Sequence, residues 1–208
     1  AKISPKGAFQ IFQPNDNQAF YDQYVKTGTS LNLLTKMTVK DRLYGQTKTY
    51  RNKAYQVDFG NGYKTNEVTN TLVSPTPKKQ NLNKDKVDIN GKPMVVGSQN
   101  YYTLSWDLDQ YRGIKADKAQ IAKGFYFVDD YPEEAVLPDD TAIQLTTSNG
   151  KAVIGVTVKN YTSLSEAPKP LQAAFEKRKI APKGAFQVFV AEDPQAFYDS
   201  YVTKGQNI

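Results

Sequence analysis

Acidic residues gather at several points of the chain, and carboxylate oxygens are the ligands that calcium prefers in proteins. Asp107 and Asp109 lie two positions apart, and the aspartates at 129–130 are followed by glutamates at 133–134. Segment 85–91 has the Asx-Gly turn of a calcium loop but lacks the glutamate that completes an EF-hand. A structural calcium ion is therefore the one cofactor hypothesis, and solvent-exposed acids at strand ends are the alternative.

Paired carboxylates could also hydrolyse glycosides, which requires two carboxyl groups held at a fixed separation. Nothing in this sequence sets such a separation, so a carbohydrate-active enzyme is the least supported function. The 208 residues contain no histidine and no cysteine. Their absence excludes Ser-His-Asp and Cys-His nucleophile pairs, His-ligated zinc and disulfides. We expect a protein that is not an enzyme.

The basic residues are dispersed along the chain. Lys and Arg number 27 against 21 Asp and Glu, which gives a net charge of +6, and the two signs are interspersed. No basic block with interleaved aromatics occurs, so we expect no nucleic-acid partner. No segment is apolar for long enough to cross a membrane. We expect no membrane partner, and we expect any signal peptide or anchor to lie outside these residues.

The chain nearly repeats its beginning at its end. Residues 2–31 and 179–208 align without a gap at an offset of 177 (179 − 2), and 18 of the 30 aligned positions are identical. Such self-similarity is typical of tandem repeats, which build extended structural or binding proteins. We therefore interpret the chain as part of an array of long repeats.

The pattern of apolar residues favours β-structure, because Tyr, Phe, Val and Thr are abundant. Short helices are expected at 18–25, 117–123 and 168–179. Strands are expected at 36–40, 53–59, 63–73, 80–88, 101–108, 125–128 and 152–159. The sequence thus predicts a mainly β protein, an Ig-like β-sandwich with short helices inserted in its connections.

A proline-rich segment at 74–79 is the best domain boundary in the chain. It divides residues 1–73, the C-terminal part of one repeat, from residues 74–208, the N-terminal and central part of the next. The two parts could complete one sandwich by permutation within a chain or by strand exchange between chains.

Four motifs together resemble a known family, and they occupy residues 55–63, 100–113, 124–135 and 183–187. They are similar to the C2-type domain of antigen I/II proteins, which are cell-wall-anchored surface adhesins of Gram-positive cocci. The resemblance covers essentially the whole chain in a circularly offset order. Family order begins near Ser74, runs to Ile208 and continues with what is here 32–73.

The resemblance implies a sandwich stabilised by an intramolecular Lys–Asn isopeptide bond. In this chemistry a buried, deprotonated lysine attacks an asparagine carbonyl that a protonated acid polarises, and ammonia leaves. Position by position, the resemblance implies that Lys79 is the lysine and Asn52 the asparagine. Asp130 or Asp129 is the implied acid, because the sequence does not fix which of the two side chains faces the lysine. Asp130 is slightly preferred.

The repeat offset complicates this bond, because Asn52 belongs to the repeat before the one that contains Lys79. The natural partner of Lys79 would lie 177 residues beyond Asn52, after Ile208. Three outcomes remain open: Asn52 reaches Lys79 within one chain, it reaches Lys79 of another chain, or no bond forms. The short linker favours exchange between chains.

The family also has an adherence region, in which a helix and the following strand bind a partner bacterium's fimbria. Its helical half matches Leu171 and Phe175, and its strand half matches Lys179, Ile180 and Lys183. Both halves depart from the family pattern, and a core stripe of Leu171 and Phe175 is the alternative.

The combined prediction is an adherence module from the stalk of an extracellular, cell-wall-anchored adhesin. Its expected partners are a host glycoprotein or a partner-bacterium surface protein, together with adjacent repeats of the same chain. The alternative is a mechanically stable spacer with no ligand of its own.

Overall fold

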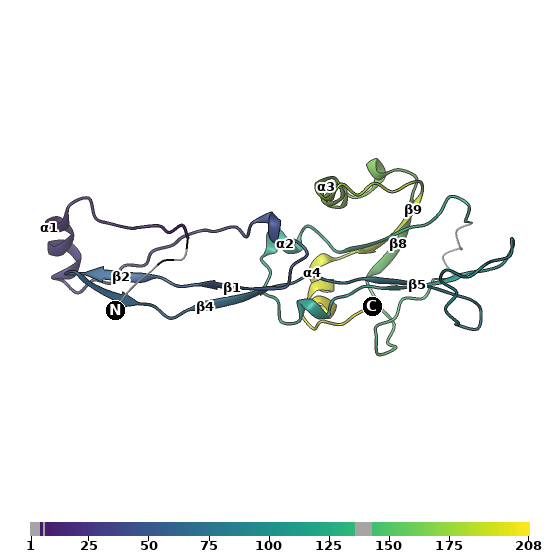
Figure 1. Cartoon of the computed structure of the whole chain (residues 1–208), viewed down its shortest axis with the longest axis horizontal. Helices are drawn as coiled ribbons and strands as arrows, with labels where there is room; N and C mark the ends of the chain where they lie inside the picture. Colours follow the sequence, from purple (N-terminus) through teal and green to yellow (C-terminus); the bar gives the residue numbers. More distant parts are fainter. Residues whose placement is uncertain (1–4, 6, 136–142) are drawn as a thin grey trace. The chain divides into compact units, whose positions relative to one another are not determined.

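A computed structural model describes residues 5, 7–135 and 143–208. The chain forms two compact units, Ala1–Leu72 and Val73–Ile208, which are described separately (Figure 1). None of the helices in the described residues is long and apolar enough to span a membrane.

The first unit consists of short helical turns and short strands. Its helix α1 (Asn17–Phe20) continues as a π-helical turn, Tyr21–Val25, and is capped by Asp16, whose carboxylate accepts from the backbone N–H of Gln18 and Ala19. Two antiparallel hairpins follow, made of β1 (Lys48–Asn52) with β4 (Val68–Leu72) and of β2 (Tyr55–Asp58) with β3 (Asn61–Lys64). No described residue of this unit is buried.

The second unit is a β-sandwich with helices in its connections. One layer pairs β5 (Lys78–Leu82) with β6 (Tyr101–Ser105). The other is the antiparallel sheet β7–β9–β8, which comprises β7 (Tyr126–Asp130), β9 (Phe186–Ala191) and β8 (Val156–Tyr161). The helices are α2 (Lys118–Ile121), α3 (Lys169–Arg178) and α4 (Pro194–Phe197), the last continuing as a π-helical turn, Tyr198–Val202.

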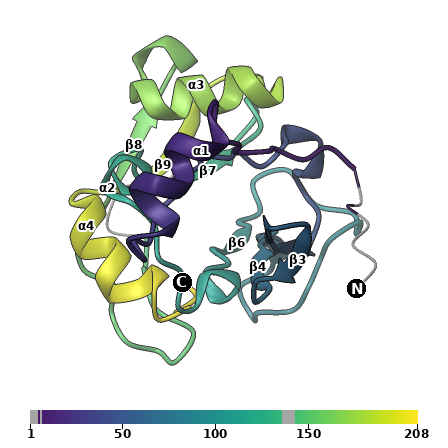
Figure 2. The ribbon, with the colours of Figure 1, turned by 90° about the vertical axis from the view of Figure 1, so that its left-hand side faces the viewer.

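Alternation along β9 builds two apolar clusters, because successive side chains of a strand point to opposite faces. Phe186 and Val188 are fully buried against Leu171 of α3, and Figure 2 shows α3 lying over this sheet. On the other face, Phe189 contacts Phe127, which in turn packs on Trp106. The aromatic pairs join the sheet to the segment that follows β6.

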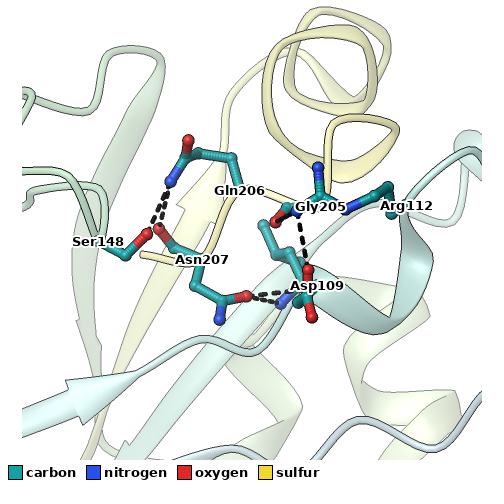
Figure 3. Close-up of polar contacts among 7 residues, drawn as sticks. Asp109, Arg112, Ser148, Gly205, Gln206 and Asn207 are labelled. Atoms are coloured by element: carbon teal, nitrogen blue, oxygen red, sulfur yellow. Dashed lines mark hydrogen bonds and ion pairs between the residues drawn. The ribbon is translucent and has the colours of Figure 1, made fainter.

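The C-terminal segment is hydrogen-bonded to the residues that follow β6 in the same unit (Figure 3). The Asn207 side-chain oxygen accepts from the backbone N–H of Leu108 and Asp109 at 2.7 and 2.8 Å. Trp106 and Ile208 exchange two backbone bonds, with N···O distances of 2.7 and 3.2 Å. This reciprocal pair is the hydrogen-bonded step of an antiparallel ladder.

The predicted mainly β class and the sandwich are confirmed, whereas several strands differ from the prediction. The strand predicted at 63–73 forms as two strands, β3 and β4. No strand forms at 36–40, although the residues alternate as expected. A strand needs a second strand to pair its backbone groups, and no backbone ladder forms at 36–40 in the described residues, although the Tyr50 hydroxyl reaches the Met37 sulfur at 3.7 Å. The strand predicted at 80–88 begins earlier, at Lys78, and ends at Leu82, where a turn around Asn83 starts.

Candidate functional site

An ion pair joins the two layers of the second unit. The Nζ of Lys79, on β5, lies 2.5 Å from Oδ1 of Asp129, on β7. The Asp129 side chain is 12% exposed and that of Lys79 is 38% exposed. The lysine therefore reaches from the rim of the sandwich toward a mostly buried carboxylate.

The register of β7 decides which of the two adjacent aspartates faces this lysine. Asp129 lies opposite Gln187 of β9, two positions from Phe127, and thus on the face that packs against Trp106. Asp130 lies opposite Phe186, on the other face, and is exposed. The structure brings Lys79 together with Asp129 and not with Asp130.

The surroundings of the ion pair are polar and incompletely hydrogen-bonded. The Tyr102 ring lies beneath Lys79, with Nζ 4.5 Å from the ring centroid. Asn81 shares this face of β5, and its Oδ1 is buried without a partner. The Nε2 of Gln187, a residue only 6% exposed, is also buried without a partner. A buried polar group left unpaired costs about 1–3 kcal/mol. One further polar group placed here could form hydrogen bonds with these unpaired atoms.

Asn52 lies in the first unit, at the end of β1. Its register partner on β4 is Val68, and Tyr50 shares its face of the hairpin. The opposite face carries Thr49 and Arg51, and Arg51 forms an exposed ion pair with Glu67. The face that carries Asn52 is mixed, because Lys48 and Asn70 lie on it beside Tyr50, Val68 and Leu72.

The residues matched to the adherence region separate by burial. Leu171 is 4% exposed and belongs to the core cluster beneath α3, and Phe175 packs against that cluster. Lys179 ends α3 in the left-handed conformation, with φ of 56°. Ile180 and Lys183 are exposed. Only the strand half therefore presents side chains to solvent.

The acidic residues considered for calcium have other contacts. Asp107 accepts from the backbone N–H and the hydroxyl of Thr76, and Asp109 pairs with Arg112. Within the described ranges, no group of three or more acidic residues is placed to hold a metal ion.

A small hollow beside the linker is lined by Pro75, Pro77, Trp106 and Tyr126, among others. Burial, and then the neighbouring Tyr161, raise the pKa of Tyr126 above its ordinary value. The pKa of Tyr131 is also raised by burial. These shifts keep both phenols neutral and supply no acid or base near Lys79.

The chain is similar to known proteins. The model of the "Cell surface antigen I/II C2 terminal domain" family matches residues 2–72 and again residues 77–208. The chain belongs to this family. The antigen I/II C2 domain thus occurs here as two matched stretches, and the family is one of cell-surface adhesins.

Individual proteins are also similar to this C2 domain protein. Aggregation substance of Enterococcus faecalis is 33% identical over 87 residues, which are 41% of this chain and 7% of that protein. The solved C-terminal domain of the Streptococcus pyogenes antigen I/II-family protein AspA has a TM-score of 0.56 at 33% identity. The match spans 64% of this chain and 40% of the AspA chain. The structure named BspA_C_mut gives a TM-score of 0.56 at 34% identity, with coverage of 65% here and 40% there.

Sequence reasoning missed Asn81, Tyr102 and Gln187 around the ion pair. Gln187 could have been recognised from the sequence, because it is a polar residue between the apolar Phe186 and Val188 in a segment that is repeated at 9–11. A polar position kept inside an apolar run of both copies indicates a specific role on the inner face. Asn81 and Tyr102 had no such signal.

Proposed function

We propose that this chain is a stalk or adherence module of a cell-wall-anchored antigen I/II adhesin, stabilised by an isopeptide bond between Lys79 and an asparagine. The single observation that supports it most is the Lys79–Asp129 pair between the sheets. A covalent bond at Lys79 would fix β5 to the strand that carries the asparagine, as a disulfide fixes two segments in proteins that contain cysteine.

The chemistry needs only groups that the chain carries. The lysine transfers a proton to the Asp129 carboxylate, and the neutral amine attacks Cγ of the asparagine side chain, so that a bond forms between Nζ and Cγ. Protonated Asp129 hydrogen-bonds to the amide oxygen and stabilises its developing negative charge. Asp129 then gives its proton to the amide nitrogen and takes one from the attached Nζ, the bond from Cγ to the amide nitrogen breaks, and that nitrogen leaves as ammonia. Asp129 rather than Asp130 fits this role because only Asp129 lies against the amine.

Asn52 is the proposed asparagine because its position matches that of the family's reactive asparagine, and it lies at the end of β1 on the face that also carries Tyr50 and Val68. Intact mass of the 208-residue chain is the test. Each bond removes one ammonia, about 17 Da per bond formed, and peptide mapping is expected to show Lys79 joined to Asn52.

Matched variants make the mass test specific. Lys79→Ala, Asn52→Ala and Asp129→Ala are expected to restore the full mass, whereas Asp130→Ala is expected to keep the loss. A wild-type chain with no mass loss at any concentration would rule out the cross-link. A cross-link that maps to another asparagine would reassign the partner of Lys79.

For the adhesin role, the exposed strand half of the adherence region is the proposed contact surface. Ile180→Asp is expected to weaken binding of the isolated module to host glycoproteins or partner bacteria. Glu176→Gln, also exposed and at the solvent side of α3, is a matched surface control that is expected to bind normally. A module that binds neither surface in its wild-type form would instead be a spacer.

A further inference from the structure

Two amide side chains border the Lys79–Asp129 ion pair, and each buries one polar atom without a hydrogen-bond partner. Gln187 buries a donor, its Nε2, and Asn81 buries an acceptor, its Oδ1. The described residues contain one further atom of this kind, Oδ1 of Asn100. Unpaired buried polar atoms are rare in folded proteins, so two of them beside one ion pair indicate a site that receives a further polar group.

The sheet register places Gln187 beside the acid of the pair. Gln187 on β9 lies directly opposite Asp129 on β7, so both side chains point to the inner face of the sheet. Residues opposite one another in an antiparallel pair have Cβ atoms about 4.5–5.5 Å apart. Nε2 of Gln187 nevertheless has no partner, and Oδ1 of Asp129 binds Lys79. The N–H groups of Gln187 are therefore held next to the acid and are available to another acceptor.

Asn81 holds the complementary atom in the opposite layer. It lies two positions after Lys79 on β5, so both side chains point to the same face of the strand. Its register partner is Tyr102, whose ring lies beneath the lysine amine. The acceptor of Asn81 is thus on the lysine side of the site, and the donor of Gln187 is on the acid side.

A primary carboxamide is the polar group that satisfies both atoms, because its oxygen accepts hydrogen bonds and its NH2 group donates them. A carboxylate has no N–H for Asn81, and its negative charge would be repelled by Asp129. An ammonium group has no acceptor for Gln187. A hydroxyl combines both functions on one atom but offers no carbonyl carbon to the lysine amine. The chemistry of the site therefore favours an amide side chain.

We propose that Gln187 and Asn81 recognise the side chain of the reactive asparagine, with Nε2 of Gln187 donating to its amide oxygen and Oδ1 of Asn81 accepting from its NH2 group. This inference rests on the proposed isopeptide function and adds two residues to it. The amide oxygen then accepts from both protonated Asp129 and Gln187, which uses its two lone pairs. As Nζ attacks and this oxygen gains negative charge, Gln187 stabilises it in the manner of an oxyanion-hole donor.

Asn81 acts at the leaving nitrogen. Its hydrogen bond to the NH2 group fixes the rotation of the amide, so that the carbonyl carbon is presented to Nζ, and fixed orientation lowers the barrier to attack. Neither Asn81 nor Gln187 gains or loses a proton, so the proton transfers remain those of Asp129. The ammonia that leaves carries away the hydrogen bond to Asn81.

The rate of cross-linking tests both residues. The full chain is isolated unfolded in urea and refolded by dilution, and its intact mass is followed over time for the loss of ammonia. Gln187→Leu removes the donor and is expected to slow the reaction at least about tenfold, because one oxyanion-hole donor contributes about 100-fold or more in acyl transfer. Asn81→Leu removes the acceptor and is expected to slow it at least about threefold, the value of one ordinary hydrogen bond.

Two exposed amides provide matched controls. Asn160 is the register partner of Gln187 on β8, and Gln80 precedes Asn81 on β5 and points to the other face. Both are exposed. Asn160→Leu and Gln80→Leu are expected to react within about twofold of wild type, because exposed substitutions have small effects. If Gln187→Leu reacts as fast as Asn160→Leu, the proposal is overturned and the proposed cross-link stands.

Urea unfolding separates a chemical role of Gln187 from a structural one. In the Asn52→Ala chain, which lacks the proposed amide, Gln187→Leu replaces an unpaired buried amide by an apolar group and is expected to be at least as stable as its parent. Gln187→Met keeps the unbranched shape without the N–H groups and is expected to slow cross-linking as much as Gln187→Leu does. Slow reaction accompanied by lower stability in the Asn52→Ala chain would assign Gln187 a structural role and overturn the proposal.

A second measurement decides the inference if wild type loses no mass, an outcome that removes the proposed cross-link. The NMR signal of the Gln187 side-chain amide then reports what its N–H groups bind in the wild-type chain. Asn52→Ala is expected to shift this signal more than Asn70→Ala does, since Asn70 is an asparagine on the same face of the β1–β4 hairpin. A larger shift keeps amide recognition without the covalent bond, whereas equal shifts would overturn the recognition as well.

Discussion

At the scale of single residues, Gln187 shows how a buried amide marks an unfinished site. Its Nε2 is buried without a partner, whereas the equivalent Gln10 is exposed and accepts from the Thr35 hydroxyl. Replacing an unpaired buried polar group by an apolar one of similar shape relieves a desolvation cost of about 1–3 kcal/mol. We expect Gln187→Leu to stabilise the Asn52→Ala chain, in which the proposed cross-link does not form, by about 1–2 kcal/mol in urea unfolding.

The repeat supplies the control for that prediction. Gln10→Leu alters an exposed side chain and is expected to change the free energy of unfolding by less than about 0.5 kcal/mol. A destabilising Gln187→Leu would mean that Nε2 has a partner in solution and that the site is already complete.

At the scale of elements, β9 and its copy in the first unit test whether burial follows from sequence or from neighbours. Phe186 lies at the centre of the core, and Phe9 is exposed. Truncation of a buried phenylalanine costs about 3–5 kcal/mol. We therefore expect Phe186→Ala to lower the midpoint of thermal unfolding sharply, and Phe9→Ala to shift it little. Equal effects of the two variants would show that the first copy also builds a core.

The same elements show what the sequence could and could not predict. Alternation predicted the strands at 53–59, 101–108, 125–128 and 152–159, which the structure contains with different bounds as β2, β6, β7 and β8. The repeat is also visible in the structure, because α1 and α4 are capped by equivalent aspartates, Asp16 and Asp193. The choice between Asp129 and Asp130 needed the register with β9, because both residues end the same strand. Segment 36–40 alternates like a strand but forms none, because pairing requires a second strand that its own sequence does not contain.

At the scale of the whole molecule, the two units differ in what holds them together. The described residues of the second unit form two buried clusters, and its C-terminus is hydrogen-bonded to Leu108. None of the described residues of the first unit is buried, and isolated two-stranded hairpins are marginal in water. Hydrogen exchange is therefore expected to be slow in β7, β8 and β9 and fast throughout 7–72 at low protein concentration. Strong protection of 7–72 would mean that this unit is stabilised by more than its hairpins.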